Sequence, residues 1–110
     1  MEILVSADLG FSVADADGIT LSFDAGDLIL SFKDWREQNV QHRFVEALAF
    51  RWAARPTLAT PRDDSTYEVG GSVWLLDELQ SEGYSASEQF VHHVLCFNAA
   101  KVLEVISRRT

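Results

Sequence analysis

Alternation of apolar and polar positions predicts that the first third of the chain is β structure. Between residues 19 and 33, hydrophobic side chains recur at every second position on either side of the glycine-containing turn 25–27. This period of two residues predicts a β-hairpin. Asp17-Gly18 is a favoured two-residue turn, because glycine tolerates a positive φ, and it predicts a second hairpin that begins with a strand within residues 10–16. A weaker apolar run predicts an opening strand over residues 2–6.

The stretch "NVQHRFVEALAFRWAA" fits two patterns. As a helix it stacks Phe44, Leu48 and Trp52 on one face at intervals of four residues. As a strand it places one set of alternate residues on the same side, with Glu46 as an interruption: Val40, His42, Phe44, then Leu48, Phe50 and Trp52. Strand is the favoured prediction, because the preceding hairpin needs partners and "DWREQN" is suited to a turn between two strands. A second helix within residues 43–54 is the alternative.

A helix over residues 72–82 is predicted from its two ends. Ser72 is suited to an N-cap, Leu75 and Leu79 share a face, and Gly83 stands where a C-cap glycine is favoured.

The C-terminal segment predicts a final hairpin, with strands at 90–97 and 102–107. Both faces of the first strand are largely apolar, so the hairpin is expected at the centre of the sheet, with Leu95, Phe97, Leu103 and Val105 in the core. A dimer interface would explain the same apolar faces. The predicted fold class is α+β: one domain, residues 1–110, with a mainly antiparallel β-meander sheet and one helix packed on a face.

Composition narrows the classes of function. The formal net charge is −8 and the pI about 4.6, which argues against nucleic acid and anionic membranes as partners. No apolar run approaches the ~18 residues of a membrane span, and the N-terminus lacks the basic segment of a signal peptide. With a single cysteine, the chain is expected to be cytoplasmic. The acidic balance suits a basic protein partner, and a homodimer is left open.

Two adjacent histidines and the only cysteine lie in "FVHHVLCF". Neighbouring residues on a strand point to opposite faces, so His92 and His93 are not expected to bind one metal ion. Cys96 shares the face of His92 but lies roughly 13 Å away along an extended strand. A cysteine between Leu95 and Phe97 is expected to be buried and inert rather than nucleophilic. No metal or other cofactor is therefore expected.

Trp35 is the strongest functional lead, because it is a large aromatic residue in the charged turn "KDWREQ". Tryptophan and arginine are enriched at binding hot spots. The hypothesis is a non-catalytic acidic binding protein, with the following partner-binding residues: Trp35, Arg36, Asp24, Asp27 and Asp34. The alternative is a small enzyme or ligand-binding domain, with the following polar residues: His42, His92, His93 and the loop acids Asp63 and Asp64.

The segments "FKDWREQNVQHRFVEALAFRW" and "HHVLCFNAAKVLEVISR" together resemble small, acidic, uncharacterised bacterial proteins, some of which are of the immunity-protein type. The resemblance spans about residues 19–107. It implies a β-meander with a final hairpin and, for the immunity type, neutralisation of a secreted toxin. It carries no defined set of site residues.

Overall fold

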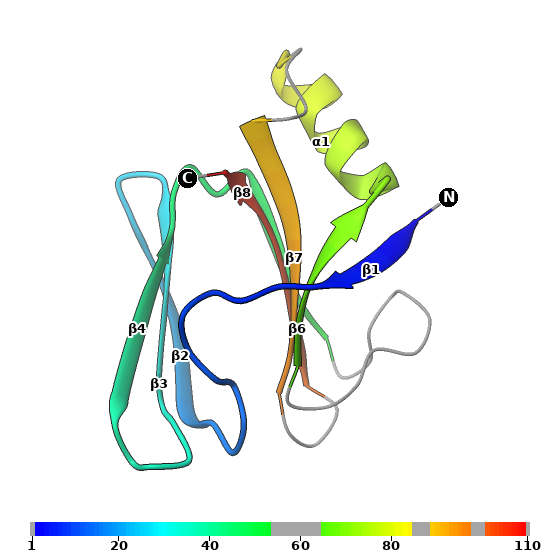
Figure 1. Cartoon of the computed structure of the whole chain (residues 1–110). Coiled ribbons are helices and arrows are strands. Elements are labelled where there is room, and N and C mark those ends of the chain that lie inside the picture. The colour runs from blue at the N-terminus through cyan, green and yellow to red at the C-terminus, as the bar shows by residue number, and fades with distance from the viewer. Residues whose placement is uncertain (1, 54–64, 85–88, 98–100, 110) are drawn as a thin grey trace.

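Two antiparallel sheets packed face to face form the protein, and one helix covers part of the outer face of the larger sheet (Figure 1). The computed structural model describes residues 2–53, 65–84, 89–97 and 101–109. The elements in it are β1 (Ile3–Ser6), β2 (Asp17–Asp24), β3 (Asp27–Lys33), β4 (Asn39–Phe44), β5 (Ala49–Ala53), β6 (Ser65–Gly70), α1 (Val73–Glu82), β7 (Phe90–Cys96) and β8 (Val102–Arg108). The larger sheet has the order β1-β6-β7-β8-β5 and the smaller one β2-β3-β4. The predicted α+β class is confirmed.

The smaller sheet is a meander built from neighbouring hairpins. Its β2–β3 turn has Ala25 at φ 53° and Gly26 at φ 88°, the pair of positive angles that a two-residue hairpin turn needs. The predicted hairpin at Asp17-Gly18 is wrong. Residues 10–16 form no strand, and Gly18 instead lies in an irregularity of β2, between Asp17 and Thr20. The chain before β2 crosses from one sheet to the other, so its apolar side chains pack onto the core instead of pairing.

Residues 39–53 are two strands, so the favoured prediction is confirmed and the helix alternative is wrong for this part of the chain. β4 pairs with β3, whereas β5 pairs with β8 of the other sheet. Between them the chain turns, with Glu46 at a positive φ of 46° that a helix does not contain. Only the smaller sheet is therefore a simple meander, because the chain changes sheets after β4.

The main hydrophobic core lies between the two sheets. Its buried residues come from both sheets and from the segment before β2: Val13, Leu28, Leu30, Phe32, Phe44, Leu95, Phe97, Leu103 and Val105. The four residues predicted for the core from the final hairpin are all among them. The rings of Phe32 and Phe97 meet edge to face across the interface, with their centroids 5.9 Å apart, a distance within the range that favours aromatic pairs.

Helix α1 begins and ends as its sequence predicts. The Ser72 Oγ accepts a hydrogen bond from the Leu75 N–H at 3.0 Å, and Gly83 adopts the left-handed conformation with φ 79°. Leu75 and Leu79 are buried against Phe90 of the larger sheet. At ten residues, α1 is too short to cross a membrane, and no other helix in the described ranges meets the length and apolarity required.

Candidate functional site

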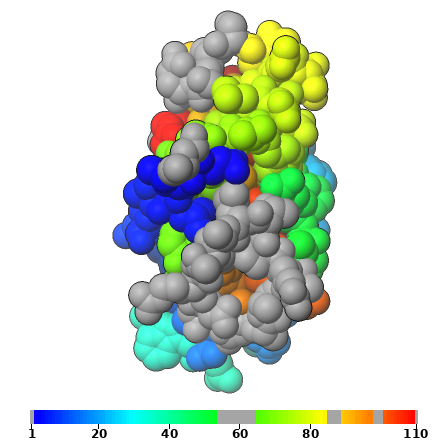
Figure 2. Space-filling view, turned by 90° about the vertical axis from the view of Figure 1, so that its right-hand side faces the viewer, coloured from blue at the N-terminus to red at the C-terminus, as the bar shows by residue number. Residues whose placement is uncertain are grey.

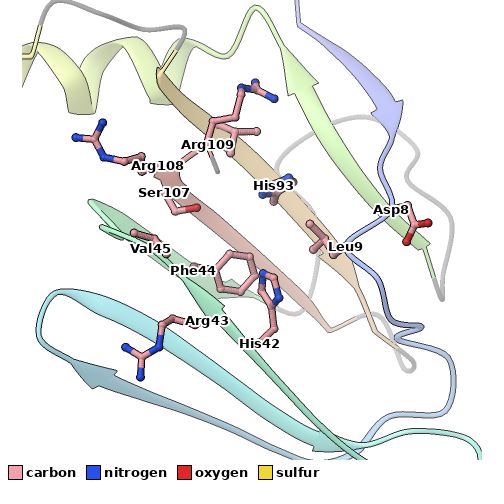
Figure 3. Close-up of a pocket in the computed structure, with 11 residues that line it drawn as sticks. Asp8, Leu9, His42, Arg43, Phe44, Val45, His93, Ser107, Arg108 and Arg109 are labelled. Carbon is pink, nitrogen blue, oxygen red and sulfur yellow. The ribbon is translucent and has the colours of Figure 1, made fainter.

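A cavity opens between the two sheets, on the side where β4 faces β7 (Figure 3). Its volume is about 280 Å³. The lining comes from β4, β7, the end of β8 and the segment after β1: Asp8, Leu9, His42, Arg43, Phe44, Val45, Val91, His93, Ser107, Arg108 and Arg109. The cavity thus combines an apolar wall with two imidazoles, one from each sheet.

Both imidazoles are neutral at pH 7. Burial lowers the pKa of His42, and burial lowers the pKa of His93 to about 4. The Nδ1 atom of His93 is buried and has no hydrogen-bond partner. Buried polar atoms are paired in the great majority of cases, so an unpaired nitrogen beside a cavity marks a place where a bound group would be stabilised. Phe44 lies between the two rings, with centroids 4.6 Å from His42 and 6.3 Å from His93.

The three arginines of the lining are each paired with carboxylates. Arg43 donates to Asp27 at 2.9 Å and to Asp24 at 3.1 Å. Arg108 donates to Glu46 at 2.9 Å, and Arg109 donates to Glu68. In Figure 3 the guanidinium groups of all three point away from His93. The charge of the arginines is therefore compensated, and Asp8, at the edge of the cavity, is a charged lining residue outside these pairs.

The buried histidine makes stability depend on pH. A base whose pKa is lower in the folded state binds fewer protons when folded, so stability falls as the pH drops from about 6.5 toward 4. For His93 the full loss is roughly 3 kcal/mol, since one pKa unit corresponds to ~1.4 kcal/mol. The free energy of unfolding, measured by urea denaturation, is expected to decrease between pH 7 and pH 5.

His93→Gln is the matched control for this pH dependence, because glutamine keeps polarity at the position without titrating. In this variant the free energy of unfolding is expected to decrease much less between pH 7 and pH 5. The remaining decrease comes from His42, whose pKa is also lowered, but by less. Glu68 and Asp27 have pKa values below their ordinary range, so their contribution appears only at more acidic pH. An unchanged pH dependence in His93→Gln would contradict the assignment to His93.

His92 lies on the opposite face of β7, away from this cavity, in a buried polar network. Its Nδ1 is 2.7 Å from the Ser72 Oγ, and its Nε2 is 2.8 Å from a Glu104 carboxylate oxygen. Arg51 donates to both oxygens of Glu104 at 3.2 Å. The carboxylate accepts, so Nε2 donates to Glu104, and in the neutral imidazole Nδ1 is then the acceptor for the Ser72 hydroxyl. His92 is therefore a hydrogen-bonded histidine inside the sheet.

Tryptophan closes this network on its outer side. The Trp74 ring meets His92 edge to face with centroids 5.1 Å apart, and the Arg51 guanidinium stacks over the same ring at 3.9 Å. Serine, histidine and glutamate are the residue types of a hydrolytic triad. Here, however, Ser72 is only 3% exposed, and its oxygen already accepts from the helix backbone. The network therefore links the N-terminus of α1 to the sheet through hydrogen bonds, and the buried Ser72 hydroxyl is not accessible to a substrate.

The turn between β3 and β4 presents Trp35 to solvent, with 58% of its surface exposed. Asp34 holds the turn in place, because its Oδ1 accepts from the backbone N–H groups of Arg36 and Gln38, both at 2.9 Å. The Arg36 guanidinium lies 5.4 Å from the Trp35 ring centre. Asp34 is itself buried and thus supports the turn from below. A polar groove of about 390 Å³ separates this turn from the segment around Phe11.

Asp24 and Asp27 lie at the opposite end of the smaller sheet from Trp35 (Figure 1). The seven residues of β3 separate the two ends by roughly 20 Å. Both carboxylates are also bound to Arg43. The structure therefore keeps Trp35, Arg36 and Asp34 together and sets the two hairpin acids apart from them.

No group of three or more histidine, cysteine, aspartate or glutamate side chains within the described residues is arranged to hold a metal ion. Cys96 is buried in the sheet. Asp63 and Asp64 lie outside the described residues. Sequence reasoning missed Glu104, although a single acid in the apolar run "KVLEVIS" is itself a signal, since a buried carboxylate requires partners.

The fold and its sites define an acidic, two-sheet antiparallel protein with one helix, an inter-sheet cavity and an exposed tryptophan turn. Comparison with models of known protein families finds no match for the chain, and comparisons with curated proteins and with solved structures find none either.

Proposed function

We propose that the protein is a non-catalytic binding protein that docks a basic protein partner through the β3–β4 turn. The single observation that carries the proposal is the exposure of Trp35 on a turn whose backbone is held by the buried Asp34. Tryptophan and arginine are two of the residue types most enriched at hot spots, and here they are neighbours. Because the turn is already ordered, little conformational entropy is lost when it docks.

The charge of the chain supports a basic partner. With 17 acidic against 9 basic residues, the protein attracts cations at long range, which increases association rates. The turn lies at the end of the molecule away from α1, where it is accessible (Figure 2). A secreted toxin neutralised by an immunity protein is one partner of this kind, in line with the resemblance of the sequence to such proteins.

The revised docking site is Trp35 and Arg36 with the groove beside them, on a turn that the buried Asp34 holds in place. Asp24 and Asp27 are left out of it, because both are ion-paired with Arg43 and because ~20 Å exceeds the Debye length of about 8 Å at physiological salt. Both acids contribute to the net charge, without contacting the partner.

Trp35→Ala is expected to speed dissociation of the partner by about 30-fold, the equivalent of the 2 kcal/mol that defines a hot spot. The melting temperature is expected to change little, because the ring is exposed. Binding is measured by surface plasmon resonance with a basic protein captured from the native host on the wild-type chain.

Phe23→Ala is the matched control, since Phe23 is also an exposed aromatic residue, at 59%, but lies beside the β2–β3 turn. Only proteins that bind wild type and Phe23→Ala, and lose affinity for Trp35→Ala, count as support. Equal dissociation rates from all three chains would place the docking surface elsewhere. A large decrease in the melting temperature of Trp35→Ala would instead assign the ring a structural role.

A further inference from the structure

We propose that the cavity between β4 and β7 is a binding site for a small uncharged ring compound that carries a hydroxyl group, of which phenol is the simplest example. The site is separate from the tryptophan turn and does not depend on the proposed docking function. Its volume of about 280 Å³ corresponds to roughly nine water molecules at ~30 Å³ each. That size fits one ring with a polar substituent.

The hydroxyl group is inferred from His93. The Nδ1 atom of His93 is buried without a partner, and the imidazole is neutral because its pKa is about 4. A neutral imidazole has one nitrogen that donates and one that accepts, depending on the tautomer. A hydroxyl group can do either, so it satisfies Nδ1 in both tautomers. Without a ligand, the unpaired Nδ1 atom lowers the stability of the fold, because it has lost its hydrogen bond to water and gained none in the protein.

The absence of charge on the ligand is inferred from the ion pairs around the cavity. Arg43, Arg108 and Arg109 are each engaged by carboxylates. An anion in the cavity would meet guanidinium groups whose charge is already compensated by those carboxylates and which point away from His93. A cation would meet two neutral imidazoles, because Asp8, a carboxylate of the lining, lies at the edge of the site and accepts from the Gly10 N–H. An uncharged molecule enters without either penalty.

The ring is inferred from the apolar wall. Phe44 stands between His42 and His93, and Leu9 and Val91 contribute aliphatic surface to the same space. Figure 3 shows Leu9, Phe44 and the two imidazoles gathered around the centre of the site. Aromatic rings pack favourably against such faces and edges. Pockets that combine an apolar wall with a few polar groups are the usual form of small-molecule sites.

The test is a titration of the full chain with phenol at neutral pH, followed by NMR of the imidazole resonances of His93 and His42. Saturable shifts are expected, with a dissociation constant on the order of 1 mM, the range of fragment-sized ligands. Benzoate and benzylammonium carry the same ring with opposite charges, and both are expected to bind at least about tenfold more weakly. Intermolecular NOEs from phenol to Phe44 and Val91 would locate the ligand in the cavity without any substitution.

His93→Leu is expected to weaken phenol binding at least about tenfold, because leucine removes the nitrogen while it retains apolar bulk. Trp35→Ala, at the far turn, is expected to bind phenol as the wild type does, which keeps this test independent of partner docking. If phenol produces no saturable shift of His93, the cavity holds water only and the proposal fails. Equal binding of benzoate would overturn the inference that the ligand is uncharged.

Discussion

Replacing Glu104 by alanine is expected to destabilise the fold by about 3 kcal/mol, the low end of the cost of breaking a buried ion pair, because Arg51 keeps partial access to water. Glu104 is 1% exposed and accepts from both Arg51 and His92. In the variant, two groups that donate to the carboxylate lose their acceptor. His92 is then no longer oriented toward Ser72, so the N-terminus of α1 is expected to loosen as well.

Two measurements check this expectation. Urea denaturation reports the global loss, and amide hydrogen exchange at Leu75 and Leu79 reports the attachment of α1. Asp24→Ala is the matched control, because it removes a carboxylate from the exposed ion pair with Arg43 and should leave the denaturation midpoint almost unchanged. Similar midpoints for Glu104→Ala and wild type would mean that the buried network adds nothing to stability.

Phe97→Ala is expected to cost about 3–5 kcal/mol, because a large ring is removed from a core that cannot collapse around the space. Phe97 is 1% exposed and contacts Phe32 of the smaller sheet and Trp52 of the larger one. The ring therefore links both layers, and its loss weakens the contact between the sheets. Chemical denaturation of the variant provides the measurement.

The control for the ring is Phe23→Ala, which removes the same side chain at a position that is 59% exposed. Its cost is expected to be a small fraction of that of Phe97→Ala. Comparable losses in the two variants would show that burial between the sheets is not the origin of the effect.

Local patterns predicted local structure well. Ser72 and Gly83 bound the helix because capping depends on neighbouring residues, and the final hairpin was predicted because apolar residues occupy both faces of its first strand. The pairing of distant strands was not predictable in this way. Nothing near β5 in the sequence indicates that this strand pairs with β8. The prediction of a hairpin at Asp17-Gly18 was wrong because the preceding segment has no strand to pair with.

The candidate sites show the same division. The sequence predicts that Trp35 is a binding residue, and the structure places its ring on an exposed turn, where binding has still to be measured. The sequence-based hypothesis placed Asp24 and Asp27 in the same binding site as Trp35. These residues are close along the chain, but closeness along the chain does not reveal that they lie at opposite ends of a strand. The cavity between His42 and His93 depends on how two sheets face each other, which a single sequence does not specify.

The division of the chain between the sheets has a consequence for synthesis. The smaller sheet is complete once residue 44 has been made, but its inner face, including Leu28, Leu30 and Phe32, packs against strands that end at residue 108. At ~5–20 residues per second, the ribosome needs several seconds to supply them. During that interval the meander exposes an apolar surface with no partner. The nascent chain is therefore most vulnerable to aggregation before the final hairpin emerges, and an early stop codon would leave that surface permanently uncovered.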